Sequence, residues 1–260
     1  MDLANNIDTI KKCRISGSSI LYPILDLGEQ PLANSLKKLN NDNEKKFPLS
    51  ISFCPKSNLV QLNQTINKNI LFDNYIWLTG TSTFANNYAE IFSKNIIENL
   101  KIEKNEFIIE IASNDGTFLK SFINKGYKNI LGIDPAMNLA DIANKRGVRT
   151  LAKYMNTSTA NEVITNYQKA KIVIARNVIP HVSEILEVIK GINILLEDDG
   201  YGIIEFHNAK TIIEELHYDS IYHEHLFYFS IKSITFLLNS FDLIPFDISF
   251  SPISGGSCVL

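Results

Sequence analysis

Three titratable side chains follow one another inside an apolar and aromatic stretch, "IYHEHLFYFS", at residues 221–230. They are His223, Glu224 and His225, and all five histidines of the chain lie at or after His181. Because histidine titrates near neutral pH, such a cluster indicates proton transfer inside a dry pocket. A positioned histidine with a pKa near the working pH is suited to general acid or base catalysis.

Two other interpretations of the histidines stay open. His223 and His225 alternate along the chain and could share one face of a strand, as two metal ligands would. The sequence has no His-Glu-x-x-His spacing, however, which argues against catalysis by a bound metal. Buried histidines are also common as hydrogen-bonded core residues, and we expect that role for His207, His217 and His223.

A second group of polar residues follows a buried strand in "IIEIASNDGTFL", at residues 108–119. Glu110 ends the strand, "ASND" forms a turn, and Gly116 opens a helix. Doubly wound sheets bind ligands beyond the carboxyl ends of their strands, where helix N-terminal amides face the ligand. Asp134 ends the next strand and is placed to accept hydrogen bonds from both ribose hydroxyls. This arrangement predicts a nucleoside-bearing cofactor.

The charge of this loop indicates which cofactor it holds. A dinucleotide site uses Gly-x-Gly-x-x-Gly to admit a pyrophosphate, and only Gly116 is present here. Glu110 would repel a pyrophosphate, whereas S-adenosylmethionine carries both an ammonium and a sulfonium. We therefore predict S-adenosylmethionine, although an ordinary turn with a helix cap also fits residues 114–116. The predicted cofactor site comprises Glu110, Ala112, Asn114, Asp115, Gly116, Asp134, Pro135 and Asn177.

Alternating strands and helices surround these residues from Asn87 onward. The order predicts an α/β, Rossmann-like domain with a doubly wound, mostly parallel sheet, preceded by a small β-rich N-terminal module. The last residues, "SPISGGSCVL", predict a new apolar strand with no partner visible in the sequence. The expected strands of the parallel sheet are 107–112, 129–134, 171–175 and 200–206.

The composition of the chain excludes some classes of binding partner. The chain has 260 residues, a formal net charge of -3 and a pI near 6.0, which argues against nucleic acid as a partner. No stretch approaches the roughly 18–20 apolar residues of a membrane span, so we expect a cytoplasmic protein without a membrane partner. The three cysteines lie far apart and are odd in number, which favours a reducing compartment.

Six segments in fixed order resemble the bacterial sugar C-methyltransferases. The resemblance runs from Cys13 to Gly256 and implies methylation of a ring carbon in a nucleotide-linked keto-deoxysugar, with S-adenosylmethionine as donor. It also implies three parts: a zinc-binding N-terminal module, a central methyltransferase domain and a C-terminal α/β domain. The segments are "ILDLGEQPLANSL", "EIASNDGTFL", "GIDPAMNLADIANKRG", "ARNVIPHVSEILEVI", "LLEDDGYGIIEF" and "IYHEHLFYFS".

The sequence departs from this family at its zinc ligands. Two Cys-x-x-Cys pairs are expected, but here they read Cys13-Arg-Ile-Ser16 and Cys54-Pro-Lys-Ser57. Neutral hydroxyls are poor zinc ligands. We therefore expect residues 1–70 to form a zinc-binding-like module, with Cys13 and Cys54 as remnants of the site, that folds without zinc or binds it weakly.

Two further departures concern the turn and the end of the chain. Ala112 stands where the family turn begins with Gly, and we expect its methyl group to alter packing without blocking the cofactor. We expect the methyltransferase domain over residues 71–250. Residues 251–260 would then be the start of a C-terminal domain that is absent, which puts substrate affinity in doubt.

The resemblance also implies roles for the polar residues. His225 would remove a proton from carbon to give an enolate, while Tyr222 and Glu224 orient it or the substrate. His181 would polarise the keto oxygen, and Tyr75 in "YIWLTGTS" would reach towards the sugar. Two alternatives stay open: an O-methyltransferase acting on a sugar or small metabolite, and a truncated remnant that binds the cofactor without turnover.

Overall fold

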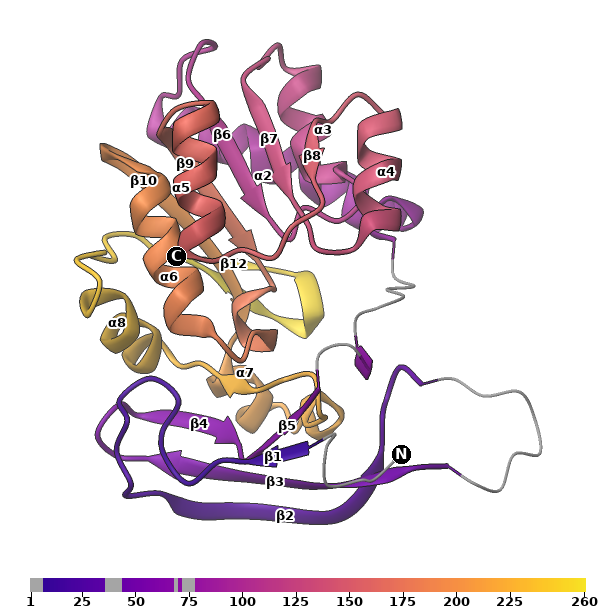
Figure 1. Ribbon diagram of the computed structural model, residues 1–260, viewed down its shortest axis with the longest axis vertical. Coiled ribbons are helices and arrows are strands. Elements are labelled where there is room, and N and C mark those ends of the chain that lie inside the picture. Colours follow the sequence, from indigo (N-terminus) through magenta and orange to yellow (C-terminus); the bar gives the residue numbers. More distant parts are fainter. Residues whose placement is uncertain (1–6, 36–43, 68–69, 72–77) are drawn as a thin grey trace. The chain divides into compact units, whose positions relative to one another are not determined.

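The computed structural model describes residues 7–35, 44–67, 70–71 and 78–260, and its chain divides into two compact units (Figure 1). Unit 1 contains the residues up to 73, 179–185 and 206–259. Unit 2 contains residues 74–178, 186–205 and Leu260. The chain therefore passes between the units several times. The predicted substrate residue Tyr75 lies outside the described residues.

Parallel strands form the centre of unit 2. They stand in the order β10-β9-β6-β7-β8, and each neighbouring pair is parallel. Every residue of β6 and β7 is buried, as expected for strands covered on both faces. This confirms the predicted Rossmann-like sheet. The strands are β6 (Ile108–Ile111), β7 (Ile130–Ile133), β8 (Thr150–Leu151), β9 (Ala170–Arg176) and β10 (Leu196–His207), whose last two residues belong to unit 1.

The strand order places a ligand-binding position at one point of this sheet. The chain order reverses between β6 and β9. From β6 the chain continues to β7 and β8 on one side of the sheet, and then crosses to β9 and β10 on the other side. Open α/β sheets bind ligands beyond the carboxyl ends of the strands at such a reversal. Glu110 and Arg176 lie near those two strand ends.

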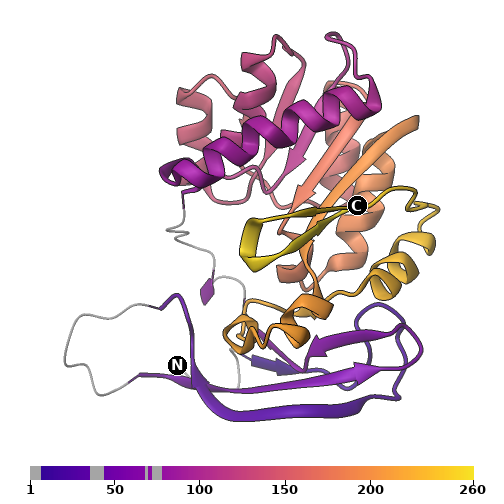
Figure 2. The ribbon, with the colours of Figure 1, turned by 180° about the vertical axis from the view of Figure 1, so that it is seen from behind.

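Helices cover both faces of the unit 2 sheet. Figures 1 and 2 show α2 on one face and α5 and α6 on the other. The helix α6 begins at Ile185, and residues Ile179–His181 before it form the 3₁₀ turn η3. No helix in the described part of the chain is long and apolar enough to cross a membrane. The helices are α2 (Thr83–Leu100), α3 (Thr117–Asn124), α4 (Met137–Lys145), α5 (Thr157–Asn166) and α6 (Ile185–Leu195), with the 3₁₀ turn η2 (Thr79–Thr81) before them.

An antiparallel sheet of order β11-β4-β3-β2 organises unit 1. Its buried apolar side chains include Phe47, Leu49 and Leu59. β11 follows the "YHEH" residues and pairs Phe227 with Gln61 of β4, so the two sequence regions share one sheet. The strands of this unit are β2 (Tyr22–Pro31), β3 (Lys46–Cys54), β4 (Leu59–Leu62) and β11 (Phe227–Tyr228), with a separate pair of β1 (Ile7–Thr9) and β5 (Gln64–Ile66).

The last strand has partners that the sequence does not reveal. β12 (Ser249–Ser251) pairs antiparallel with β13 (Ser257–Val259) across the turn η5 (Ile253–Gly255). Within unit 2, Leu260 exchanges backbone hydrogen bonds of 2.9 and 3.0 Å with Ile204. The expectation of a strand without a partner is therefore wrong. The remaining helices of unit 1 are α7 (Ala209–Glu214), η4 (Tyr218–Ser220) and α8 (Ile231–Asn239).

Close packing around β7 gives a test of the sheet. A Cβ added at Gly132 would lie 2.4 Å from Ser113 Oγ and 2.6 Å from Thr150 Oγ1, both on buried residues. We expect Gly132→Ala to lower the free energy of unfolding by about 1–3 kcal/mol through overpacking. Gly202→Ala in β10 is the matched control, since its Cβ would meet only atoms 3.8 Å or more away. Urea unfolding that finds both variants equally stable would contradict this packing.

Candidate active site

A tight turn follows β6 and contains four of the predicted cofactor residues. Ala112, Asn114 and Gly116 all have positive φ, at 53, 52 and 76°. A Cβ at Gly116 would lie 2.9 Å from Val148 Cβ, so both the conformation and the space require glycine there. Asparagine tolerates this conformation, whereas alanine does not favour it. Ala112, where the family has Gly, therefore occupies a strained position.

Asp134 fastens this turn to the end of β7. Its Oδ2 accepts a hydrogen bond of 2.8 Å from the backbone N–H of Asn114, and its Oδ1 accepts one of 2.9 Å from Ala136. Burial raises the pKa of Asp134, and the two backbone donors partly offset that effect. Asp134 and the adjoining Pro135 thus lie at the predicted strand end, and each carboxylate oxygen keeps a second lone pair for a ligand hydroxyl.

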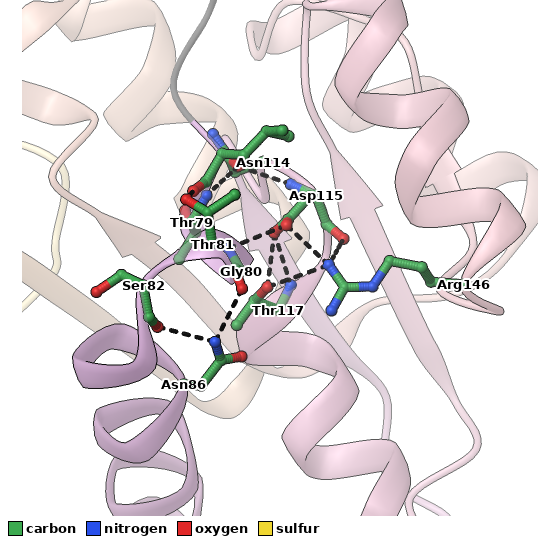
Figure 3. Close-up of polar contacts among 10 residues, drawn as sticks. Thr79, Gly80, Thr81, Ser82, Asn86, Asn114, Asp115, Thr117 and Arg146 are labelled. Carbon is green, nitrogen blue, oxygen red and sulfur yellow. Dashed lines mark hydrogen bonds and ion pairs between the residues drawn. The ribbon is translucent and has the colours of Figure 1, made fainter.

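The side chain of Asp115 is hydrogen-bonded to other protein groups (Figure 3). Its Oδ2 accepts from the backbone N–H of Gly80 at 3.0 Å and from Arg146 at 2.7 Å, and its Oδ1 accepts from the hydroxyl of Thr117 at 2.7 Å. The backbone N–H of Thr79 donates to Asn114 Oδ1 at 3.0 Å. These contacts hold η2 against the turn, so Asp115 shapes the site instead of presenting its charge to a ligand.

Glu110 is the buried acceptor of the site. Its Oε2 has no hydrogen-bond partner among the described residues. Burial raises the pKa of Glu110 to about 8, although the guanidinium of Arg176 opposes that rise. A buried carboxylate with one unused oxygen fits a cationic ligand, and Asp134 fits a nucleoside hydroxyl. Asn177, the remaining predicted residue, donates its backbone N–H to the carbonyl of Glu205 at 2.8 Å.

Tyr222 and His225 form a hydrogen-bonded pair in unit 1. Nδ1 of His225 lies 2.8 Å from the carbonyl oxygen of Ser220, which can only accept, so Nδ1 carries the proton. Nε2 of His225 then accepts from the Tyr222 hydroxyl at 3.0 Å. Burial lowers the pKa of His225 to about 3, well below the expected value near neutrality. The imidazole is therefore neutral, and its basic nitrogen is held by a phenol.

His181 lies beside this pair. The ring centroids of His181 and His225 are 4.8 Å apart. Burial lowers the pKa of His181 to about 4, and its Nδ1 has no hydrogen-bond partner in the described parts of the chain. Unit 1 therefore brings together all four residues predicted for proton transfer, including Glu224, whereas the predicted cofactor residues gather in unit 2.

Glu224 has a partner that the sequence did not indicate. Its Oε1 accepts a hydrogen bond of 2.7 Å from the side-chain amide of Asn34. Burial raises the pKa of Glu224, and that hydrogen bond partly offsets the rise. Asn34 lies in "PLANSL", inside a segment that carries the family resemblance, but no spacing rule links positions 190 residues apart.

The other histidines make structural contacts. Nε2 of His223 lies 3.3 and 3.2 Å from the carbonyl oxygens of Phe47 and Pro48, to which it donates. His223 thus fastens its segment to β3. His217 Nδ1 lies 3.5 Å from His207 Nε2. No group of three or more metal-binding side chains occurs among the described residues.

Two thiols and two hydroxyls meet at the predicted zinc position. Cys13 Sγ lies 3.2 Å from Ser57 Oγ, and Ser16 Oγ lies 3.5 Å from Cys54 Sγ. Although burial raises the pKa of Cys54, hydrogen bonds from Ser16 and Ser57 bring it down to about 7. Each thiol is thus paired with a hydroxyl. This donor set does not fit tetrahedral zinc, which requires four good ligands.

Comparisons with known families cover most of the chain. Residues 13–72 match a family described as "Putative zinc binding domain", and residues 84–244 match one described as "Methyltransferase domain". The C-methyltransferase NovU of Streptomyces niveus is 29% identical over 253 residues, which cover 96% of this chain. The chain spans 60% of the length of that relative.

Solved structures of low sequence identity share the fold. Magnesium protoporphyrin IX methyltransferase from Synechocystis PCC 6803 with bound SAH has a TM-score of 0.53 at 11% identity, covering 74% of this chain and 90% of that one. The same enzyme with bound SAM has a TM-score of 0.51 at 11% identity, covering 74% and 86%. These likenesses support the Rossmann-like fold of class I methyltransferases.

The thiol–hydroxyl cluster predicts how zinc binding can be restored. The variant Ser16→Cys with Ser57→Cys supplies four thiols at positions that already converge, so we expect it to bind one zinc ion per chain. The native protein, expressed in zinc-supplemented medium, should carry far less. Elemental analysis after gel filtration measures both. Stoichiometric zinc in the native protein would contradict the prediction.

The buried histidines predict a pH-dependent stability. A histidine whose pKa is lowered by folding contributes stability above its unfolded value near 6.5, and that contribution is lost as the pH falls towards its folded pKa. Between pH 7 and 5 we expect a loss on the order of 1–2 kcal/mol for each of His181 and His225. Urea unfolding at both pH values should therefore show a smaller loss in a His181→Gln, His225→Gln variant. Equal losses would contradict the neutral histidines.

Proposed function

We propose that this chain methylates a carbon of a nucleotide-linked keto-deoxysugar. The premise is that the chain belongs to the methyltransferase-domain family and is an S-adenosylmethionine-dependent methyltransferase. The observation that carries this proposal is the pairing of neutral His225 with Tyr222 beside His181. The likeness to a C-methyltransferase over 96% of this chain supports carbon as the methylated atom.

The donor would be held by residues of unit 2. S-adenosylmethionine supplies an electrophilic methyl group on a positively charged sulfur. Glu110 provides a buried carboxyl group with one unused oxygen. Its raised pKa of about 8 keeps it mostly protonated at pH 7 without a ligand, and a cationic ligand favours its ionised form. Asp134 provides acceptors for ribose hydroxyls, and the turn from Ala112 to Gly116 brings backbone close to the ligand.

Carbon becomes nucleophilic only when a proton is removed beside the ketone. In the proposed step, Nε2 of His225 takes the proton of the carbon next to the carbonyl, and the electron pair of that C–H bond forms the enolate. The Tyr222 hydroxyl, which occupies Nε2 in the structure, turns to the substrate. His181 polarises the keto oxygen and stabilises the negative charge that develops on it.

The low pKa of His225 constrains the substrate. An imidazole whose conjugate acid has a pKa of about 3 is too weak a base to remove a carbon-bound proton efficiently. A substrate that brings negative charge into the pocket favours the imidazolium form and raises this pKa. The diphosphate of a nucleotide-linked sugar supplies that charge.

Solvent exchange tests the role of His225. In deuterium oxide with the keto-sugar, the native protein should exchange the proton on the carbon next to the ketone, as NMR or mass spectrometry detects. We expect His225→Asn to slow this exchange by roughly 10²–10⁴-fold, the usual contribution of a general base. His217→Asn, which alters a partly exposed histidine of the same unit, should retain the native rate.

Two results would overturn this assignment. Unchanged exchange in His225→Asn would show that another group is the base. No exchange in the native protein, together with methyl transfer to a hydroxyl, would establish O-methylation, while binding of the donor without any turnover would establish a cofactor-binding remnant.

A further inference from the structure

Three charged side chains are buried together in unit 2. Nε of Arg176 at the end of β9 lies 2.7 Å from Glu205 Oε2 on β10, and its Nη1 lies 3.9 Å from Glu110 Oε1 on β6. Their side chains are 10, 0 and 3% exposed. The hydroxyl of Tyr88 on α2 donates to Glu205 Oε1 at 3.1 Å. Arg176 is thus shared unequally, because its short contact is with Glu205 and its long contact is with Glu110.

Aromatic rings hold the guanidinium in that position. Its central carbon lies 3.2 Å from the ring centroid of Phe118, 5.2 Å from that of Phe92 and 5.7 Å from that of Tyr88. Stacking on rings and an ion pair through Nε fix a planar guanidinium more firmly than an ammonium could be fixed. Arg176 therefore has little freedom to move closer to Glu110.

This fixed arrangement leaves negative charge at the end of β6. One cation faces the two carboxylates of Glu110 and Glu205, and the charges of Asp134 and Asp115 also act on Glu110. Oε2 of Glu110 has no partner among the described residues. An uncompensated buried carboxylate is costly, so it either takes up a proton or binds a cation. Arg176 is the group that favours the ionised form.

We infer that Arg176 is a positioning residue for the methyl donor: clamped by Glu205 and the aromatic rings, it supports the charge of Glu110 without occupying the oxygen that receives the cationic ligand. This inference rests on the proposed contact between Glu110 and the donor. Arg176 itself does not touch the donor. Its effect on donor binding therefore passes through Glu110 alone.

A double-mutant cycle on donor binding tests this dependence. Replacing Arg176 alone would remove the cation beside buried Glu205, so the pair is removed together as Arg176→Met with Glu205→Gln. Calorimetry at pH 7 measures the Kd of S-adenosylmethionine in four proteins: native, the paired variant, Glu110→Gln, and all three substitutions combined. Urea unfolding confirms that each protein is folded. Lys169→Met with Asp198→Asn removes an exposed ion pair of 3.2 Å in the same unit and serves as control.

The inference predicts non-additive losses. The paired variant should weaken binding several-fold when Glu110 is present, because the effect of Arg176 on the pKa of Glu110 is larger than the opposing effect of Glu205. In the Glu110→Gln background the loss should be less than about 2-fold. Affinity of the paired variant should recover as the pH is raised, because Glu110 then ionises without help. Arg176→Lys with Glu205 intact keeps a positive charge but loses the stacked, planar clamp, so it should bind more tightly than the paired variant and more weakly than the native protein.

The outcomes separate this inference from the proposed function. An equal loss in both backgrounds, without recovery at higher pH, would show that Arg176 acts through packing and would overturn the inference while leaving Glu110 as a donor contact. Native affinity in Glu110→Gln would overturn both the inference and the proposed donor contact. Neither result bears on which atom of the substrate is methylated.

Discussion

Negative charge buried at the carboxyl end of β6 is the constraint on which the donor site depends. A carboxylate removed from water, with one oxygen lacking a partner, costs free energy unless a cation or a proton joins it. Arg176 offsets only part of that cost, because its guanidinium lies 2.7 Å from Glu205 and 3.9 Å from Glu110. The parallel strands place this charge where the chain order reverses, which is the position at which sheets of this class receive ligands.

Unit 1 holds two buried histidines whose pKa values are lowered by burial. Burial lowers the pKa of His181 to about 4 and that of His225 to about 3, so both are neutral at pH 7, as the proposed role of His225 as proton acceptor requires. Two contacts join the "YHEH" segment to the N-terminal region: the side-chain amide of Asn34 donates to Glu224, and carbonyl oxygens of β3 accept from His223. The segment that matches the zinc-binding family, residues 13–72, thus contacts the residues proposed for proton transfer, while its predicted metal position consists of paired thiols and hydroxyls.

Local sequence patterns could predict the parts of the fold that local physics determines. β-branched runs indicated β6, β7, β9 and β10, and the acidic residues that end two of these strands indicated the cofactor site. No helix was predicted over residues 157–166, where α5 opens on the polar run Thr-Ser-Thr and buries only Thr159, Ala160 and Val163. The pairing of β12 with β13, like that of β11 with β4, depends on tertiary contacts that no single segment encodes.

The same limit applies to the site. Arg176 and Glu205 stand out in the sequence only as charged residues in apolar strands, and nothing local indicates that they form an ion pair. Asn34 is an ordinary loop residue until the fold brings it to Glu224. The low pKa of His225 likewise follows from burial, which composition does not determine. Types of residue were therefore predictable, whereas their partners and ionisation states required the structure.

The most direct measurement of the central claim is the position of the transferred methyl group. The native protein is incubated with S-adenosylmethionine carrying a ¹³C-labelled methyl group and with a panel of nucleotide-linked 4-keto-sugars, and the products are examined by NMR and mass spectrometry. The account predicts a label bonded to the ring carbon beside the ketone. A label on oxygen, or no transfer to any member of the panel, would contradict it.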